Sequence, residues 1–186
     1  HTILMNPFIE YIRAALEMVT KGFSYESVFR YLRCDMSGLG REQVDMLENY
    51  VLALGIHGYK KWSEKWVRVY RTMDPEDIQV LNEYREIFVR EAEILAQGFS
   101  SGKRKVCEYC YSLYQFIESC EIQKKLKKQE LFFKEKGEKA LEKEYAQIYG
   151  IVMELLDRMV EILGEEEITR TEFVQLLETG FAKSKV

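Results

Sequence analysis

The chain has 186 residues, of which 47% are hydrophobic and 31% are charged, and its formal net charge is −4. This hydrophobic content is enough for a sizeable core, and it excludes an intrinsically disordered chain. The acidic balance excludes a domain that binds nucleic acid over a uniformly basic surface, since such domains carry a basic excess. Any contact with DNA must therefore be local.

Helical patterns follow one another along the chain, and turn residues separate them. Asn6 and Pro7 form a typical helix start, because asparagine accepts free main-chain N–H groups and proline fits the first helical position. Gly55 is placed to end the third helix, with Ile56 folding back as its apolar partner. The longer helices are expected from Pro7 to Gly22, from Ser24 to the turn at 37–40, over 44–54, from Asp74-Pro75 to Gly98, over 106–117, from Gly137 to Gly164, and from Thr169 or Thr171 to Gly180.

Two stretches are less regular than the rest. Residues 57–66 are expected to form a loop that leads into a short helix. Residues 121–143 contain eight lysines among glutamates and few apolar positions, which predicts a solvated helix pair around Gly137. The sequence therefore predicts an all-α fold, an irregular bundle of about eight helices without strands. Residues 1–186 would form one helical subdomain, with 1–98 and 99–186 as candidate lobes.

The sequence contains no secretory signal and no apolar run of the roughly 18 residues that suggest a membrane span. A cytoplasmic protein that makes no membrane contact is therefore expected. The first residues, His1 and Thr2, suggest a fragment excised from a larger protein.

The motifs of common enzyme classes are absent. There is no phosphate-binding GxxxxGK[ST] loop, no GxGxxG turn, no HExxH and no GxSxG. Apart from the terminal His1, the sole histidine is His57, which is interpreted as a loop residue near two glycines. We expect no catalytic residue and no bound cofactor. The acidic run Glu165–Glu167 is interpreted as a solvated turn.

The four cysteines raise the question of a metal site. Cys107 and Cys110 have the spacing of a zinc-binding pair, but structural zinc needs four ligands and the second pair is missing. Residues three apart share one face of a helix, so both cysteines are expected to line a core face as reduced thiols, and Cys34 and Cys120 are also expected to be reduced. We expect no metal; a metal-regulated DNA-binding protein that uses Cys107 and Cys110 stays an alternative.

One segment has the character of a DNA contact. The segment from Tyr59 to Arg71 contains five basic residues and a single acidic one, Glu64, and aromatic residues are interleaved with them. Basic side chains neutralise phosphates and aromatic rings stack on unpaired bases. The alternative is that the two tryptophans are core anchors surrounded by lysines. The candidate DNA contacts are Lys60, Lys61, Trp62, Lys65, Trp66, Arg68 and Arg71.

Several elements of the sequence resemble one protein family. The stretch from Ser24 to Leu39 is similar to its "VxRLLK(T/S)GL" element, and Val44–Ile56 followed by Gly58 and Trp62 is similar to its "LENYVL…GI.G…W" run. The start Asn6–Ile9 and the segment from Glu166 to Phe181 resemble two further elements. The family is AddB/RexB, the B subunit of ATP-dependent helicase–deoxyribonucleases of the AddAB/RexAB type. Asp35-Met36 departs from its usual small-residue turn.

The resemblance implies a place in the mainly helical insertion of a superfamily 1 helicase-like second domain. It implies a role in double-strand DNA end processing and recombinational repair, with an A subunit (AddA/RexA-like) as partner and DNA bound through the parent complex. ATP, Mg²⁺ and an iron–sulfur cluster are implied for the parent complex alone, since none of the four cysteines matches a cluster ligand. The chain itself is expected to be a non-catalytic helical scaffold. A freestanding helical protein–protein interaction module with an apolar groove is the alternative.

Overall fold

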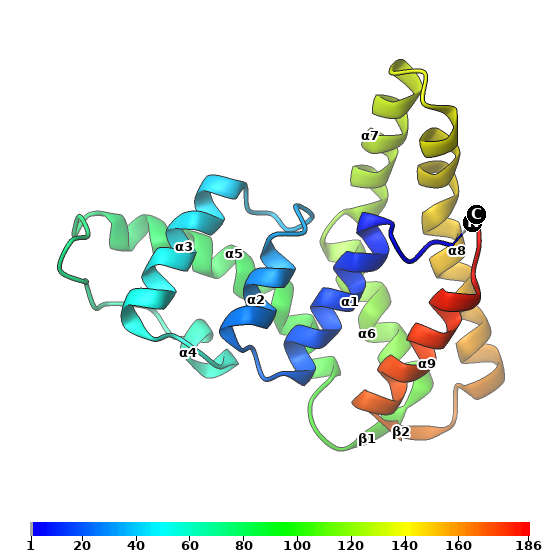
Figure 1. The fold of residues 1–186 in the computed structure, drawn as a ribbon. Coiled ribbons are helices and arrows are strands. Elements are labelled where there is room, and N and C mark those ends of the chain that lie inside the picture. The colour runs from blue at the N-terminus through cyan, green and yellow to red at the C-terminus, as the bar shows by residue number, and fades with distance from the viewer. Residues whose placement is uncertain (1) are drawn as a thin grey trace.

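Nine helices and one short strand pair make up residues 2–186, the part of the chain described by this computed structural model (Figure 1). The predicted all-α class is confirmed, with nine helices where about eight were expected. The helices are α1 (Pro7–Thr20), α2 (Tyr25–Leu32), α3 (Arg41–Leu54), α4 (Tyr59–Ser63), α5 (Asp77–Gly98), α6 (Val106–Ser119), α7 (Ile122–Glu135), α8 (Lys139–Leu163) and α9 (Arg170–Lys183). The strands are β1 (Lys103–Lys105) and β2 (Glu167–Thr169).

Most helix boundaries follow from local capping. The side chain of Asn6 accepts a hydrogen bond from the N–H of Phe8 at 2.8 Å, as its N-cap role predicts. Gly55 has a φ of +66°, a left-handed conformation that costs glycine little, and it ends α3. The N–H of Ile56 then donates to the carbonyl of Val51 at 3.1 Å, which confirms the predicted glycine-ended cap.

The predicted end of the last helix is wrong. Helix α9 begins after Thr169, which forms a reciprocal capping box with Glu172, but it continues past Gly180 to Lys183. A Cβ atom at Gly180 would lie 2.7 Å from Cδ1 of Leu155 in α8. This glycine therefore allows α9 to pack closely on α8, and it does not end the helix.

The expectation of no strands is also wrong at one place. Strand β1 pairs antiparallel with β2, and Arg104 lies opposite Ile168. Three residues are too few to produce the alternating pattern by which a strand is recognised in sequence. The pair joins the segments that lead into α6 and α9.

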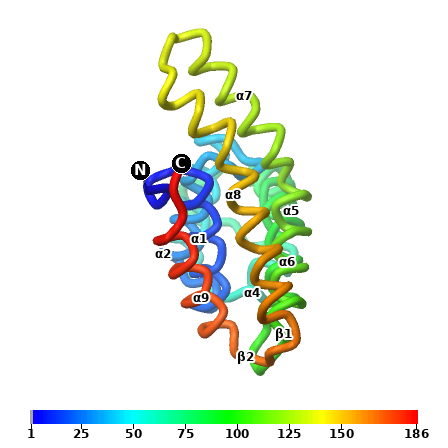
Figure 2. The backbone as a smooth tube through the Cα atoms, turned by 90° about the vertical axis from the view of Figure 1, so that its right-hand side faces the viewer, coloured from blue at the N-terminus to red at the C-terminus, as the bar shows by residue number. Residues whose placement is uncertain are grey.

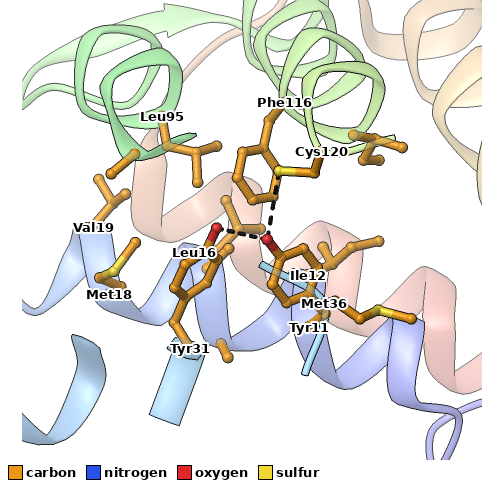
Figure 3. Packing of buried hydrophobic residues seen from close by; sticks show 14 of the residues in the cluster. Tyr11, Ile12, Leu16, Met18, Val19, Tyr31, Met36, Leu95, Phe116 and Cys120 are labelled. Carbon is orange, nitrogen blue, oxygen red and sulfur yellow. Dashed lines mark hydrogen bonds between the residues drawn. The ribbon is translucent and has the colours of Figure 1, made fainter. Parts of the chain in front are cut away.

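The core is centred on α1, which packs against α2, α5 and α9. All nine helices contribute side chains to one hydrophobic cluster. Within it, the hydroxyls of Tyr11 and Tyr31 lie 2.6 Å apart, and the Tyr11 oxygen lies 3.5 Å from the Cys120 sulfur (Figure 3). Tyr31 donates to Glu91 of α5 at 2.8 Å, so this polar chain links α1, α2 and α5 to Cys120, the residue directly after α6. The division into lobes 1–98 and 99–186 stays a prediction.

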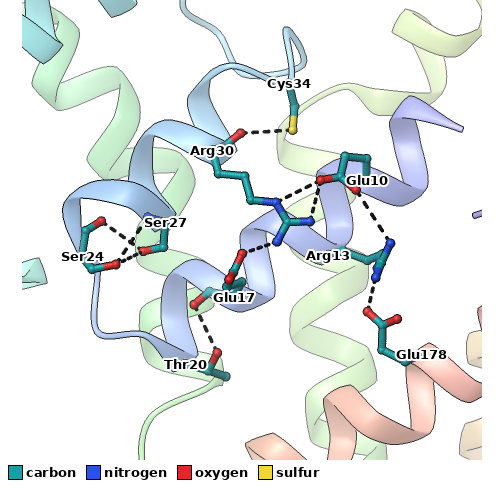
Figure 4. Close-up of polar contacts among 9 residues, drawn as sticks. All are labelled: Glu10, Arg13, Glu17, Thr20, Ser24, Ser27, Arg30, Cys34 and Glu178. Carbon is teal, nitrogen blue, oxygen red and sulfur yellow. Dashed lines mark hydrogen bonds and ion pairs between the residues drawn. The ribbon is translucent and has the colours of Figure 1, made fainter. Parts of the chain in front are cut away.

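Charged side chains fasten α1 to its neighbours at the surface (Figure 4). Arg30 of α2 reaches both Glu10 and Glu17 of α1. Arg13, three residues after Glu10 on α1, contacts Glu178 of α9 with 2.7 Å between Nε and Oε1. Because these groups are about one-third exposed, each pair contributes modestly to stability.

Helices α7 and α8 form an antiparallel pair that projects beyond the rest of the molecule (Figures 1 and 2). Gly137 stands between them with a φ of +72°, so the predicted turn is confirmed. Near the base of the pair, Thr2 and Lys185 form an isolated bridge that holds both ends of the described chain together. In residues 2–186, no helix is both long enough and apolar enough to cross a bilayer.

Candidate nucleic-acid interface

The predicted DNA-contacting segment lies between α3 and α5. Residues 59–63 form α4, residues 65–70 have no regular secondary structure, and a turn follows. A loop over residues 57–66 that leads into a short helix was expected; the short helix lies within this run, and Trp66 lies outside it. All five basic side chains are exposed, and together we call them the basic surface: Lys60, Lys61, Lys65, Arg68 and Arg71.

Both tryptophans lie beneath the basic surface. Trp62 and Trp66 are 1% and 4% exposed. The ring of Trp62 lies 4.6 Å from that of Phe88 on α5, and Trp66 stacks on Tyr50 of α3 at 4.6 Å between centroids. These indoles anchor the segment in the core, as the alternative interpretation held. DNA contact by the seven candidate residues stays a prediction, and in this conformation it would involve the five basic side chains.

Two polar residues of α5 hold the main chain under the basic surface. Asn82 accepts from the N–H of Trp66 at 2.9 Å and donates to its carbonyl at 2.8 Å. Arg85 donates from Nε to Asn82 Oδ1 at 2.9 Å and from Nη1 to the carbonyl of Trp62 at 3.0 Å. The indole N–H of Trp66 donates to the carbonyl of Lys61 at 3.0 Å. Three hydrogen bonds from α5 thus fix the segment, and one bond within it adds to its order.

The electrostatics of this region are positive. Arg85 is 4% exposed, and its guanidinium carbon lies 5.9 Å from the centroid of the Trp66 ring. Burial lowers the pKa of Arg85, but arginine starts from so high a value that it keeps its charge at neutral pH. The single acid of the segment, Glu64, approaches Lys61 at 3.9 Å. The basic surface therefore retains a local positive excess on an acidic chain.

The sequence interpretation missed Asn82 and Arg85. Both are buried, and Arg85 lies four residues after Leu81 and three before Phe88, on the helix face that these two apolar residues share. A charged residue at such a position indicates a buried polar contact, because unpaired buried charges are strongly unfavourable. That signal was available in the sequence, although the partners of the two side chains were not.

The cysteines show no geometry for a metal site. Cys107 is partly exposed and Cys110 is buried, and burial raises the pKa of the Cys110 thiol to about 12. Burial also raises the pKa of Cys34 to about 11. Metal binding needs the thiolate, which such surroundings disfavour. Within residues 2–186, no three or more His, Cys, Asp or Glu side chains gather as a metal-binding group. The metal-regulated alternative stays a hypothesis without a supporting cluster.

These features define the class of protein: a helical domain with a local basic surface on an otherwise acidic chain. Comparison with curated proteins then gives the family. The chain is 39% identical to a protein of Lachnoclostridium phytofermentans over 99% of its own length, and 40% identical to one of Clostridium novyi over 97%. A Clostridioides difficile protein is 34% identical over 95% of the chain.

Each of these relatives is named as the B subunit of an ATP-dependent helicase/deoxyribonuclease. The chain spans about 16% of the length of each of them. No family model matches the chain. The resemblance predicted from the sequence is confirmed, since the chain is similar to these helicase/deoxyribonuclease B subunits along nearly its whole length.

Proposed function

We propose that the chain is a non-catalytic helical scaffold within the B subunit of an ATP-dependent helicase–deoxyribonuclease, and that its basic surface contacts DNA. The observation that carries the DNA contact is the set of five exposed basic side chains on a main chain fixed from α5. The sequence similarity to the helicase/deoxyribonuclease B subunits supports the parent complex, and the missing catalytic motifs support the scaffold role.

The proposed contact is electrostatic. Lysine and arginine side chains neutralise phosphates and release condensed counterions, without reading the base sequence. Asn82 and Arg85 hold the main chain that carries the basic surface. The five basic side chains would therefore bind DNA with little loss of backbone freedom. The two buried tryptophans would stiffen the support and leave the bases untouched.

The remaining assignments follow from the family resemblance. We propose that the chain belongs to the helical insertion of a helicase-like second domain, that an A subunit is its partner, and that the complex acts in the cytoplasm on double-strand DNA ends. ATP, Mg²⁺ and an iron–sulfur cluster would be bound in other parts of that complex. The chain would brace those parts and flank the DNA path.

Charge reversal tests the DNA contact. Lys60, Lys61 and Lys65 are changed together to glutamate in a helicase–deoxyribonuclease whose B subunit contains this chain, and affinity for DNA ends is measured over a range of salt. Loss of three phosphate contacts should weaken binding at low salt and reduce the slope of log affinity against log salt by roughly 2 to 3. Reversal of three exposed lysines on the α7–α8 pair is the matched control: Lys128, Lys134 and Lys139. Unchanged affinity in the first variant would remove the proposed contact.

The scaffold role has its own test. The isolated 186-residue chain is expected to hydrolyse neither ATP nor DNA. Turnover that persists at constant specific activity through successive purification steps would contradict a non-catalytic role.

A groove between α6, α7 and α8 favours a second candidate, the freestanding interaction module. It has a volume of about 810 Å³, and Ile117, Leu131 and Tyr149 line it together with lysine side chains of α7. A partner helix would fit such a groove through apolar contacts. A reading frame limited to this chain would favour the module, and one that extends well beyond it would favour a part of the larger complex.

A further inference from the structure

Between residues 65 and 69, the main chain bonds to the rest of the protein at two alternate residues, Trp66 and Arg68. One amide, that of Asn82, bonds both the N–H and the carbonyl of Trp66, which is how a neighbouring strand bonds an extended residue. Two residues further on, the carbonyl of Arg68 accepts from the hydroxyl of Tyr50 at 2.8 Å. In an extended chain, alternate residues direct their main-chain groups to opposite sides. Inward bonds at alternate residues are the pattern of an extended segment, in which the main-chain groups of Lys65, Val67 and Val69 point away from the protein.

This outward edge is open. Val67 and Val69 are 73% and 42% exposed, and both belong to the exposed large apolar residues of the described chain. Within residues 2–186, no hydrogen bond engages the main chain of either valine. A row of unpaired N–H and carbonyl groups beside exposed apolar side chains is a ready template for another strand.

We propose that residues 65–69 accept an extended acidic segment of a partner polypeptide by β-strand addition. The ladder would use the N–H and carbonyl groups of Val67 and Val69, and their side chains would pack against alternate apolar side chains of the incoming strand. The acidic preference follows from Lys65, Arg68 and Arg71, which flank the edge and have no acidic partner in the described chain. This partner site goes beyond the proposed function, because it depends on the main chain and not on phosphate neutralisation.

The edge suits a polypeptide better than a nucleic acid. A strand supplies both donors and acceptors to the unpaired carbonyls and N–H groups, whereas a phosphate supplies acceptors alone. Two exposed valines also match the alternating side chains of a strand. Nucleic acid on the same edge is a separate outcome of the test below.

The first experiment uses proline as a main-chain probe. Binding of a fluorescein-labelled nine-residue peptide of alternating glutamate and valine to the 186-residue chain is followed by anisotropy. Val67→Pro removes one N–H and leaves the extended conformation accessible, since proline favours extended backbone at the residue before it. Val67→Thr, which keeps the N–H and the branched shape, is the matched control. Loss of ladder hydrogen bonds should weaken the proline variant about tenfold, and the threonine variant should stay within about twofold.

A peptide N-methylated at alternate residues should also bind the unaltered chain about tenfold more weakly, because it lacks half of its donors. Amide hydrogen exchange on the unaltered chain is a second measurement that needs no variant. The Trp66 amide should be protected with or without peptide, whereas the amides of Val67 and Val69 should exchange rapidly until the peptide is added.

Equal peptide affinity of the proline and threonine variants would overturn the proposal, as would protection of the Val67 amide in the free chain. Binding of single-stranded oligothymidylate at these amides, with no binding of the peptide, would also overturn it. Val67→Pro should leave DNA binding unchanged, whereas reversal of Lys60 and Lys61 should weaken it. Failure of the strand site and failure of the DNA contact are therefore distinguishable.

Discussion

Replacing Asn82 with alanine would remove the side chain that fixes the main chain below the basic surface. The variant loses both hydrogen bonds to Trp66, each contributing about 1 kcal/mol net, and leaves buried main-chain groups without partners. It also loses the bond from Arg85, and hydrogen bonds to charged groups contribute about 1.5–3 kcal/mol. The free energy of unfolding should therefore fall by about 3–5 kcal/mol.

Equilibrium urea denaturation followed by tryptophan fluorescence measures this loss where it occurs. Trp62 and Trp66 are the two tryptophans of the chain, and both lie in the affected segment. Glu83→Ala is the control, because Glu83 is the next residue of α5 and is exposed, so its removal should change stability by less than about 0.5 kcal/mol. If Asn82→Ala costs less than about 1 kcal/mol, the hydrogen bonds do not hold the segment as described.

Two further predictions concern packing and titration. In Gly98→Ala, the new Cβ would lie 2.1 Å from Oγ of Ser112, so α5 and α6 must separate and the free energy of unfolding should fall by about 1–3 kcal/mol. Adding Ser112→Gly to this variant should recover part of the lost stability. A thermal melt that Gly98→Ala leaves unchanged would contradict the close approach of the two helices. Burial raises the pKa of Glu91, although hydrogen bonds from Gly38 and Tyr31 oppose the shift. The folded chain then binds this proton more tightly than the unfolded chain, so the stabilisation due to Glu91 is greatest at acidic pH and decreases as pH rises through its raised pKa. A carbon-13 NMR titration should find the midpoint above the ordinary glutamate value, and a midpoint at or below that value would contradict the effect of burial.

The sequence predicts those features of the fold that depend on residues close together in the chain. Asn6 and Gly55 act through groups within four residues of themselves, so their roles are visible in sequence. Gly180 looks the same as a helix-ending glycine, but its role depends on Leu155, which lies 25 positions earlier in the chain and in another helix. The strand pair is not predicted for the same reason, because it brings Arg104 opposite Ile168 through tertiary structure.

The candidate site divides in the same way. The positive excess of residues 59–71 is a property of composition, and the exposed basic side chains agree with it. The burial of Trp62 and Trp66 was one of two interpretations, and packing against α3 and α5 decides between them. The main chain of Trp66 is held by Asn82, a residue 16 positions away, and no pattern within the segment predicts this contact.

Photo-crosslinking tests most directly whether this helical scaffold turns its basic surface toward DNA. Benzoylphenylalanine replaces Lys61 in a helicase–deoxyribonuclease whose B subunit contains this chain, and replaces the equally exposed Lys134 of α7 in the control. With a labelled double-strand DNA end bound, irradiation should join DNA to the protein from position 61 far more efficiently than from position 134. Efficient joining from position 134, with none from position 61, would place the DNA path elsewhere and contradict the account.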